Sequence, residues 1–390
     1  MADAQPKAKA SSLLTLLALG NFVVGMGAFV LIGVVSPIAE GLGVSTADVG
    51  IVLTSYAVAY ALLSPIGAAL TGRLPRRTVL TAALGMFCAG SLISALAPSL
   101  AVLVASRLLV AMGAALYTPL AAGVAVAVST PEQRGRALAK VYGGMTLAQV
   151  VGVPLGAWLA YRFGWHAPFF VVAAMAALCA AVLVHSIPSN VSFPAGNLAS
   201  IVTALGNKKL MIAVTFTATV MAAVYVLFTF FAPLIQASAG SNPETRAAYL
   251  MLFGIGAVSG NHLGGILSDK LGPFRTLVMV CVAHILLLPV FSLIPLHPVA
   301  LAVLVFVWSN FAWCFVAPQQ ARLVTIAPQA AALSLALNAA MIYLGIAIGS
   351  AAGGELVAWQ GLGGLGLAAS AMAVLALIHL VWSDRVARRA

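Results

Sequence analysis

Acidic residues are the scarcest feature of this sequence, with eight Asp and Glu in 390 residues. Charged residues of both signs make up only 7% of the chain, whereas an ordinary soluble domain contains roughly a quarter. Hydrophobic residues account for 63%. The shortage of charge therefore excludes an ordinary soluble protein and indicates a protein of the lipid bilayer.

Several signatures of enzymes are missing as well. No Gly-Lys pair occurs, so no Walker A loop can hold the phosphates of ATP, and neither GxSxG nor HExxH is present. The cysteines, Cys88, Cys179, Cys281 and Cys314, have no CxxC spacing and indicate neither a disulfide framework nor a zinc site. We therefore expect a protein that is not an enzyme and that carries no cofactor or metal, and any transport must use a gradient instead of ATP.

Apolar sequence is abundant and comes in stretches of about 20 residues, the length that spans a bilayer core. The first stretch is too long for a signal peptide and lacks a cleavage pattern, so we interpret it as a retained span. The sequence therefore predicts an all-α integral membrane protein with twelve transmembrane helices, at about 13–36, 49–70, 78–97, 100–129, 136–160, 167–187, 210–237, 247–268, 276–296, 299–324, 332–355 and 364–383.

The positive net charge of +11 is explained by membrane orientation. Lys and Arg near the ends of spans stay on the cytoplasmic side. With the N-terminus inside, sixteen of the nineteen basic residues fall in inside segments, Arg162 and Arg246 fall outside, and Arg107 lies within a span. We therefore expect both termini to be cytoplasmic, and the charge requires no nucleic acid as a partner.

An internal repeat divides the chain into two halves. The loop GILSDKLGPFR at 265–275 repeats AALTGRLPRRT at 68–78, at an offset of 197, and three further pairs of matching stretches have offsets of 196 or 197. The longest polar break, PSNVSFPAGNLASIVTALGNKK, lies between the halves. The predicted organisation is an N-terminal six-helix half at 1–187, a cytoplasmic linker at 188–209 and a C-terminal six-helix half at 210–390.

Parallel six-span halves are the architecture of secondary transporters that bind substrate between the halves near the middle of the membrane. Four features of the sequence carry a family resemblance: the motif GxLxDxxGxxR, Arg107 followed by Gly113, PEQRGRA, and GVPLG in the fifth span. In these the chain resembles the major facilitator superfamily over nearly its whole length. Within that superfamily it is similar to the twelve-span drug:proton antiporter branch, and most similar to bacterial arabinose- or sugar-efflux-like permeases.

The resemblance implies the major facilitator fold and the export of a small organic molecule by alternating access. It also implies proton antiport, in the inner membrane of a bacterium. Direction, coupling ion, substrate identity and oligomeric state do not follow from the sequence. We expect a monomer whose partners are a small molecule, protons and lipid.

Arg107 is the strongest candidate for the substrate or coupling site, because a charge within a span is costly and usually functional or paired. The resemblance places the matching arginine in the central cavity, with a role in proton coupling or substrate binding. A structural arginine bonded to carbonyl groups is the alternative. None of the eight acids falls deep in the predicted cavity, so a neutral or anionic substrate is favoured, with Arg107 as a ligand for carboxylate or phosphate.

His262 is the candidate to replace the missing acid, because histidine titrates near neutral pH and the eighth span faces the cavity in this fold. The other candidates are neutral residues that the resemblance places on cavity-lining spans, although each one singly is more often a packing residue. They are Asn21, Tyr56, Tyr117, Gln149, Tyr225, Asn310, Asn338 and Tyr343, accompanied by the aromatic residues Phe228, Phe231, Trp308 and Trp313.

The two copies of the repeated loop predict an asymmetric gate on the inner side. The resemblance implies that each copy packs against the start of a span in the other half. Asp269 then meets the start of span five, where Arg134 and Arg136 offer positive charge, and this contact holds the outward-facing state. In the other copy Gly72 replaces the acid beside Arg73, so that side closes by packing. The Gly-rich run of Gly152, Pro154 and Gly156 in span five is expected to allow close helix approach at the gate.

Two alternatives to a proton-coupled exporter remain open at the level of sequence. One is a proton-independent facilitator or an importer of a small metabolite. The other is a membrane sensor that has kept the fold and lost transport.

Overall fold

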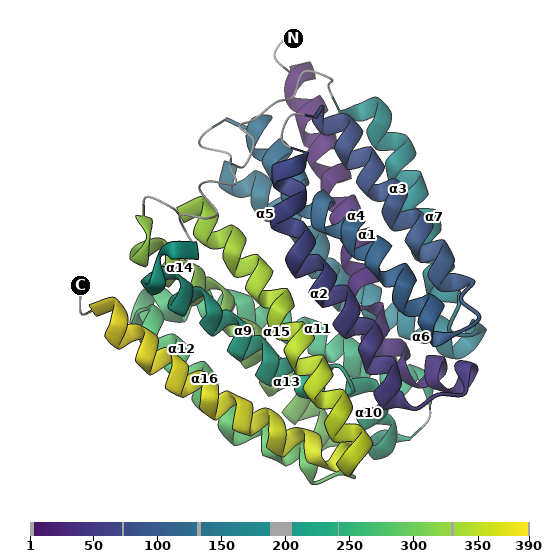
Figure 1. Ribbon diagram of the computed structural model, residues 1–390, viewed down its shortest axis with the longest axis vertical. Coiled ribbons are helices and arrows are strands. Elements are labelled where there is room, and N and C mark those ends of the chain that lie inside the picture. Colours follow the sequence, from purple (N-terminus) through teal and green to yellow (C-terminus); the bar gives the residue numbers. More distant parts are fainter. Residues whose placement is uncertain are drawn as a thin grey trace.

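The computed structural model describes residues 4–71, 74–130, 134–187, 205–240, 242–328 and 331–388, and these residues form helices joined by short turns, with no strand among them (Figure 1). The first half of the chain contains α1 (Ala4–Leu42), α2 (Thr46–Leu70), α3 (Arg76–Ala95), α4 (Leu100–Ala127), α5 (Arg134–Leu147), the π-helix η2 (Ala148–Gly152), α6 (Val153–Phe163) and α7 (Ala167–Ser186).

The second half contains α9 (Lys208–Phe228), α10 (Phe231–Ala239), α11 (Pro243–Leu271), α12 (Pro273–Leu287), the 3-10 helix η3 (Leu288–Ser292), α13 (Pro298–Cys314), α14 (Val316–Ile326), α15 (Ala331–Gln360), the 3-10 helix η5 (Leu362–Gly364) and α16 (Leu365–Arg388). We refer to α1–α7 as the N-half and to α9–α16 as the C-half.

The described residues form twelve helical segments that are long and apolar enough to cross a membrane, which confirms the predicted all-α, twelve-span fold. Five of these segments consist of more than one element. They are span five (α5, η2 and α6), span seven (α9 and α10), span nine (α12 and η3), span ten (α13 and α14) and span twelve (η5 and α16). Periodicity alone does not reveal these breaks, because the apolar residues continue through them.

The two halves repeat the same turns. The φ angle is positive at Gly43 between α1 and α2 and at Gly240 between α10 and α11, two positions 197 residues apart. It is also positive at Gly164 after α6 and at Gly361 after α15, again 197 residues apart. Glycine is required at these turns because a side chain is disfavoured at positive φ. The helix ends therefore carry the repeat that the sequence offset indicates.

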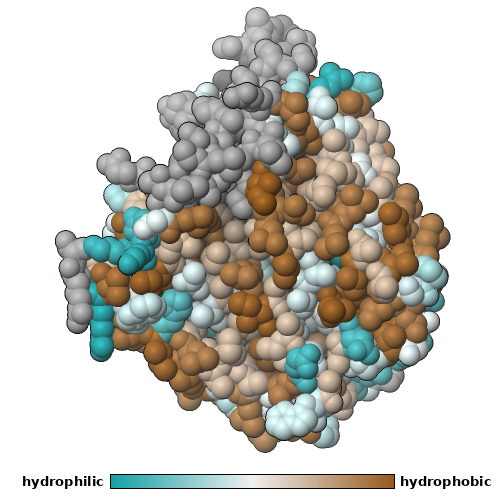
Figure 2. Space-filling view, in the orientation of Figure 1, coloured by the Kyte–Doolittle hydropathy of each residue, from teal (hydrophilic) through white to brown (hydrophobic). Residues whose placement is uncertain are grey.

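On the face seen in Figure 2, apolar side chains are spread over both halves. Leu178, Leu286 and Ile378 are each 60% exposed or more, which would be unfavourable over so large a surface in water. In a bilayer these side chains face acyl chains.

The first and seventh spans lie at the centre of the bundle. Their most apolar windows are 89% and 78% buried, against 33–50% for the other ten described spans. Neighbouring helices approach them at glycines. A Cβ at Gly144 of α5 would lie 1.8 Å from Ala18 O of α1, and a Cβ at Gly345 of α15 would lie 2.5 Å from Ala218 O of α9. Close backbone approach of this kind is how helices pack in lipid.

An even number of spans brings both ends of the chain to one side of the bundle, which we call the terminal face. The opposite side, with the turns at Gly43, Gly164, Gly240 and Gly361, is the far face. In Figure 1 the halves meet around α6 and α10 toward the lower right and diverge toward the upper left, with the N-terminus at the top and the C-terminus at the left. Between the halves, α2 packs along α15, and η2 and α6 pack along α11.

Candidate functional site

Arg107 of α4 is fully buried and lies close to the boundary between the halves. Its Nη2 donates a hydrogen bond of 2.6 Å to Gly27 O of α1. Its Nε and Nη1 have no hydrogen-bond partner. The guanidinium carbon lies 4.9 Å from the centroid of the Tyr56 ring of α2. The arginine is therefore held at one nitrogen and has donors left over for a ligand.

Three tyrosines continue from Arg107 across the boundary. Tyr56 and Tyr60 lie on one face of α2, with ring centroids 6.2 Å apart. Tyr343 of α15 stacks on Tyr60 at 3.6 Å with 24° between the ring planes, and its centroid lies 6.1 Å from that of Tyr56. All three rings are at least nine-tenths buried. The cluster thus joins the N-half to the C-half near the middle of both helices.

The tyrosine cluster lies between the far face and the terminal face of the boundary between the halves. Side-chain contacts from one half to the other occur at this cluster, between Tyr343 and both Tyr56 and Tyr60, and at residues of the far face. On the side of the cluster toward the terminal face, Tyr142 of α5 is 44% exposed. The described halves are therefore in contact at the far face and in the middle, and their ribbons diverge toward the terminal face (Figure 1).

No acidic side chain that the structure describes lies beside Arg107. The acidic residues that the structure describes occupy helix ends and exposed or half-buried positions, at Glu40, Asp48, Glu244, Asp269, Glu355 and Asp384. Asp48, for example, forms a capping box with Ser45 at the start of α2. A buried arginine without a carboxylate partner leaves its positive charge available to a ligand.

Two predicted polar residues are engaged inside their own halves. Asn21 of α1 donates to Val141 O of α5 at 3.1 Å and accepts from the hydroxyl of Thr118 of α4 at 3.0 Å. In the C-half, Thr217 of α9 donates to Asn338 Oδ1 of α15 at 2.5 Å. These bonds connect spans one, four and five, and spans seven and eleven.

Gln319 of α14 completes the C-half network. Its Nε2 donates to Ala213 O at 2.8 Å and to Thr217 Oγ1 at 3.0 Å. The side chain is fully buried. Spans seven, ten and eleven are thus tied by one polar cluster, as spans one, four and five are in the N-half.

The remaining aromatic candidates lie within single halves. Tyr117 donates to Leu17 O at 3.3 Å. Trp308 of α13 packs among Phe228, Phe231 and Phe253, with ring centroids 5.1–6.0 Å away. These contacts form the aromatic core of the C-half, which also holds Tyr225 beside Phe228 at 5.5 Å.

Three further candidates lie on or near α11. His262 is exposed on that helix. Asn310 of α13 accepts from Ser259 Oγ of α11 at 2.8 Å and donates to Phe306 O. Gln149 lies in η2, where its backbone packs against Gly254 of α11. Trp313, the last aromatic residue of the sequence prediction, is half-buried in α13.

The predicted inner gate is only partly described. Asp269 is exposed near the end of α11 and forms no ion pair with any side chain that the structure describes. Gly72 and Arg73 lie outside the described residues, as do the side chains of Arg134 and Arg136. Within span five, Gly152 and Gly156 face Met26 and Val30 of α1, and Pro154 is at the start of α6.

Sequence reasoning missed two features of this region. Tyr60 was not among the predicted residues, although its spacing of four from Tyr56 in SYAVAYA places both rings on one helix face. The π-helix in AQVVG was missed too, and its extra residue per turn leaves no mark in an apolar sequence. Single-turn π-helices occur frequently at functional sites.

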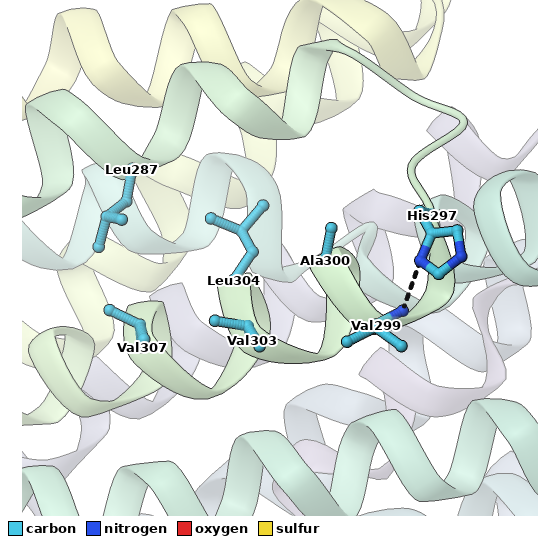
Figure 3. A pocket seen from close by; sticks show the side chains of 7 residues that line it. All are labelled: Leu287, His297, Val299, Ala300, Val303, Leu304 and Val307. Carbon is cyan, nitrogen blue, oxygen red and sulfur yellow. Dashed lines mark hydrogen bonds between the residues drawn. The ribbon is translucent and has the colours of Figure 1, made fainter.

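One described hollow lies elsewhere, at α12 and α13 of the C-half. It measures about 650 Å³ and is lined by Leu287, His297, Val299, Ala300, Val303, Leu304 and Val307 (Figure 3). His297 Nδ1 accepts from Val299 N and is the only polar side chain in the lining. A hollow of this composition at the ends of α12 and α13 suits lipid acyl chains, and it contains no residue predicted for substrate binding.

Comparison with known proteins agrees with this geometry. The chain is similar to the uncharacterized MFS-type transporter YbcL of Bacillus subtilis, at 29% identity over 342 residues and 88% of each chain. It is similar at 29% identity over 349 residues, and 89% of each chain, to the inner membrane transport protein YdhP of Escherichia coli.

Solved structures show the same fold. One is a bacterial homolog of the human lysosomal transporter Spinster in an inward-facing, unoccupied conformation, with a TM-score of 0.79, 20% identity and 97% of each chain covered. Another is a D-xylose-proton symporter, with a TM-score of 0.76, 17% identity, and 95% of this chain and 96% of that chain covered. The sequence profile described as Major Facilitator Superfamily matches residues 17–350. The chain is therefore a multi-pass membrane transporter that belongs to the major facilitator superfamily.

Proposed function

We propose that this protein exports a small organic molecule, neutral or anionic, by alternating access and in exchange for protons. It acts as a monomer in the inner membrane of a bacterium, with both termini in the cytoplasm. The terminal face is then the cytoplasmic face. The name of the Escherichia coli relative, an inner membrane transport protein, supports this location.

The observation that carries the proposal is the environment of Arg107. A fully buried guanidinium with free Nε and Nη1 groups, and with no described acid beside it, favours a ligand that brings negative charge or hydrogen-bond acceptors. Tyr56, whose ring lies 4.9 Å from the guanidinium carbon, adds a buried hydroxyl. A cation would find no counter-charge at this point and would be repelled by Arg107.

The tyrosine cluster supplies the apolar walls of the proposed site. Small ligands bind in sites with apolar or aromatic walls and a few placed polar groups. Tyr60 and Tyr343 belong to different halves, so a ligand that separates their rings also changes the contact between the halves. This arrangement supports transport over a sensor role. Both ligand binding at the proposed site and the relative position of the halves depend on the contact between Tyr60 and Tyr343.

Proton coupling is proposed with His262 as the candidate carrier, because no carboxylate among the described residues lies beside Arg107. His262 is exposed on α11. A proton-independent facilitator or an importer is the alternative, and His262→Gln distinguishes them. We expect this variant to lose the response of transport to a pH gradient while retaining binding.

The experiment combines a screen for ligand binding with a measurement of ligand transport across a membrane. Purified protein is tested by thermal shift against neutral, anionic and cationic compounds, since a ligand that binds only the native state raises its apparent stability. Hits are then tested for flux in proteoliposomes with and without an imposed pH gradient. Stabilisation by cations alone contradicts the Arg107 argument. Flux that is indifferent to pH contradicts antiport, and absence of flux for every stabilising ligand favours the sensor.

A further inference from the structure

The two basic residues of the far face both contact the opposite half. Arg162 ends α6 in the N-half and forms an ion pair with Glu244 in the first turn of α11 in the C-half. Arg246 of α11 lies over the Tyr161 ring of α6, with its guanidinium carbon 3.4 Å from the ring centroid. Each helix thus contributes one arginine to the other, Arg162 of α6 to Glu244 of α11 and Arg246 of α11 to Tyr161 of α6.

Several features hold these groups in place. Asn242 caps the start of α11 by accepting from Glu244 N at 2.9 Å, with Pro243 in the first turn. Glu244 therefore lies at the positive end of one helix dipole, and Arg162 lies at the negative end of another. Glu40 at the end of α1 adds a negative charge beside Arg246. The helix ends therefore stabilise the negative charge of Glu244 and the positive charge of Arg162, and Glu40 stabilises the positive charge of Arg246.

The distribution of charge along the chain makes the pair unusual. Lys and Arg are depleted on the face of a membrane protein that is translocated, and among the described residues Arg162 and Arg246 are the only Lys or Arg at the far face. Each is used in a contact between the halves. By contrast Glu355, also toward the far face, is exposed and forms no ion pair with any described residue.

We propose that Arg162–Glu244 and Arg246–Tyr161 form a clasp that holds the far face closed and that must open in every transport cycle. The inference rests on alternating access between the halves and is independent of the substrate, its direction or its coupling ion. The clasp is electrostatic and about half exposed, since the Arg162 and Glu244 side chains are 54% and 49% accessible. Its strength therefore depends on ionic strength.

The test measures the distance between the halves in the full-length protein in lipid nanodiscs. Spin labels are placed at Leu96→Cys in the N-half and Trp359→Cys in the C-half, two exposed positions at the far face, after the native cysteines are replaced. No substrate is needed, so failure of the proposed function and failure of the clasp are distinguishable. The readout is the ratio of far-face-open to far-face-closed molecules in a pulsed electron–electron distance measurement.

Removing one charge, in Arg162→Gln or Glu244→Gln, should raise the open-to-closed ratio by up to about fivefold, the range of an exposed ion pair. Arg162→Glu should raise it further, because two carboxylates then face each other. The swap Arg162→Glu with Glu244→Arg should restore part of the closed population. The restoration is incomplete because each charge then lies at the unfavourable end of its helix dipole.

Glu355→Gln is the matched control, since it removes an acid from the same region without touching the clasp. Added salt should raise the open fraction of the parent protein and have little effect on Arg162→Gln. The proposal is overturned by an unchanged ratio in Arg162→Glu, by a swap that behaves no better than Arg162→Glu alone, or by an equal shift in Glu355→Gln.

Discussion

At the scale of single residues, Arg107 shows how an unsatisfied group marks a site. Burying a charge without a partner is costly, and here only Nη2 is engaged, by Gly27 O. The backbone carbonyl fixes the orientation of the guanidinium without neutralising its charge. Thr217, also fully buried, has its hydroxyl engaged by two neighbours. The Arg107 guanidinium is therefore available to a ligand, whereas the Thr217 hydroxyl holds helices together.

Arg107→Lys should lower kcat/KM for an anionic substrate by about tenfold to a hundredfold, the range expected for a lost charge-assisted hydrogen bond. A lysine keeps the charge but cannot both reach Gly27 O and present further planar donors. Flux in proteoliposomes and ligand-induced thermal shift measure the effect. Arg275→Lys, at an exposed position, is the control and should behave as the parent protein. Equal transport by Arg107→Lys would contradict a ligand role for the guanidinium.

Thr217→Val should destabilise the protein by about 1–3 kcal/mol, because the buried amides of Asn338 and Gln319 lose their shared partner. Thr215→Val is the matched control. That threonine lies two positions away on α9 and bonds only to carbonyls of its own helix, Met211 O and Ile212 O. Midpoints of thermal unfolding in detergent compare the two. Similar losses would show that the network contributes little.

At the scale of helices, adjacent glycines of α5 have different surroundings. A Cβ at Gly144 would lie 1.8 Å from Ala18 O of α1, while a Cβ at Gly143 would meet nothing within 4 Å. The face of α5 that carries Gly144 is therefore in backbone contact with α1, whereas the face that carries Gly143 has open space beside it. The same pattern recurs between α11 and α13, where a Cβ at Gly260 would lie 2.1 Å from Asn310 O.

Gly144→Ala should separate α5 from α1 and reduce the yield of folded protein, because the contact is with rigid backbone. Gly143→Ala should be neutral or stabilise by up to about 1 kcal/mol, since alanine is favoured over glycine in a helix. Size-exclusion profiles and thermal unfolding of the two purified variants provide the comparison. The packing assignment fails if both substitutions are tolerated equally.

At the scale of the whole molecule, the contacts between the halves are unevenly distributed. The far face has the clasp and the middle has the Tyr60–Tyr343 stack. Asp269 of the inner gate is exposed. We expect the inner gate to form when the halves close toward the terminal face, where Asp269 would meet the start of span five.

Asp269→Asn and Arg162→Gln should therefore shift the protein in opposite directions. The first removes a charge expected only in the state that is closed at the terminal face, and so favours the arrangement described by the structure. The second removes a charge pair present in that arrangement. Thiol-reactive probes at single cysteines on either face measure accessibility, and the double variant should return toward the parent distribution. Shifts of the same sign would contradict this assignment of the two gates.

The sequence was sufficient to predict the fold, because the length of the apolar stretches and the 197-residue repeat can both be read from it without knowing how the helices pack. The site was less predictable. Arg107 was found since a lone charge is conspicuous in an apolar span, but the stacking of Tyr60 on Tyr343 depends on how two distant helices meet. Asn21 and Asn338 look alike as isolated polar residues in spans. Only the structure shows that each is bonded within its own half.

The stack of Tyr60 and Tyr343 also has an optical consequence. Two phenol rings 3.6 Å apart act as coupled chromophores, and the coupling lasts only while α2 and α15 keep their rings together. Separation of the halves at mid-membrane should therefore change the tyrosine region of the near-ultraviolet circular dichroism spectrum. Tyr60→Leu supplies the spectrum without the stack. The conformational cycle can then be followed in unlabelled protein, during turnover, from a signal native to the chain.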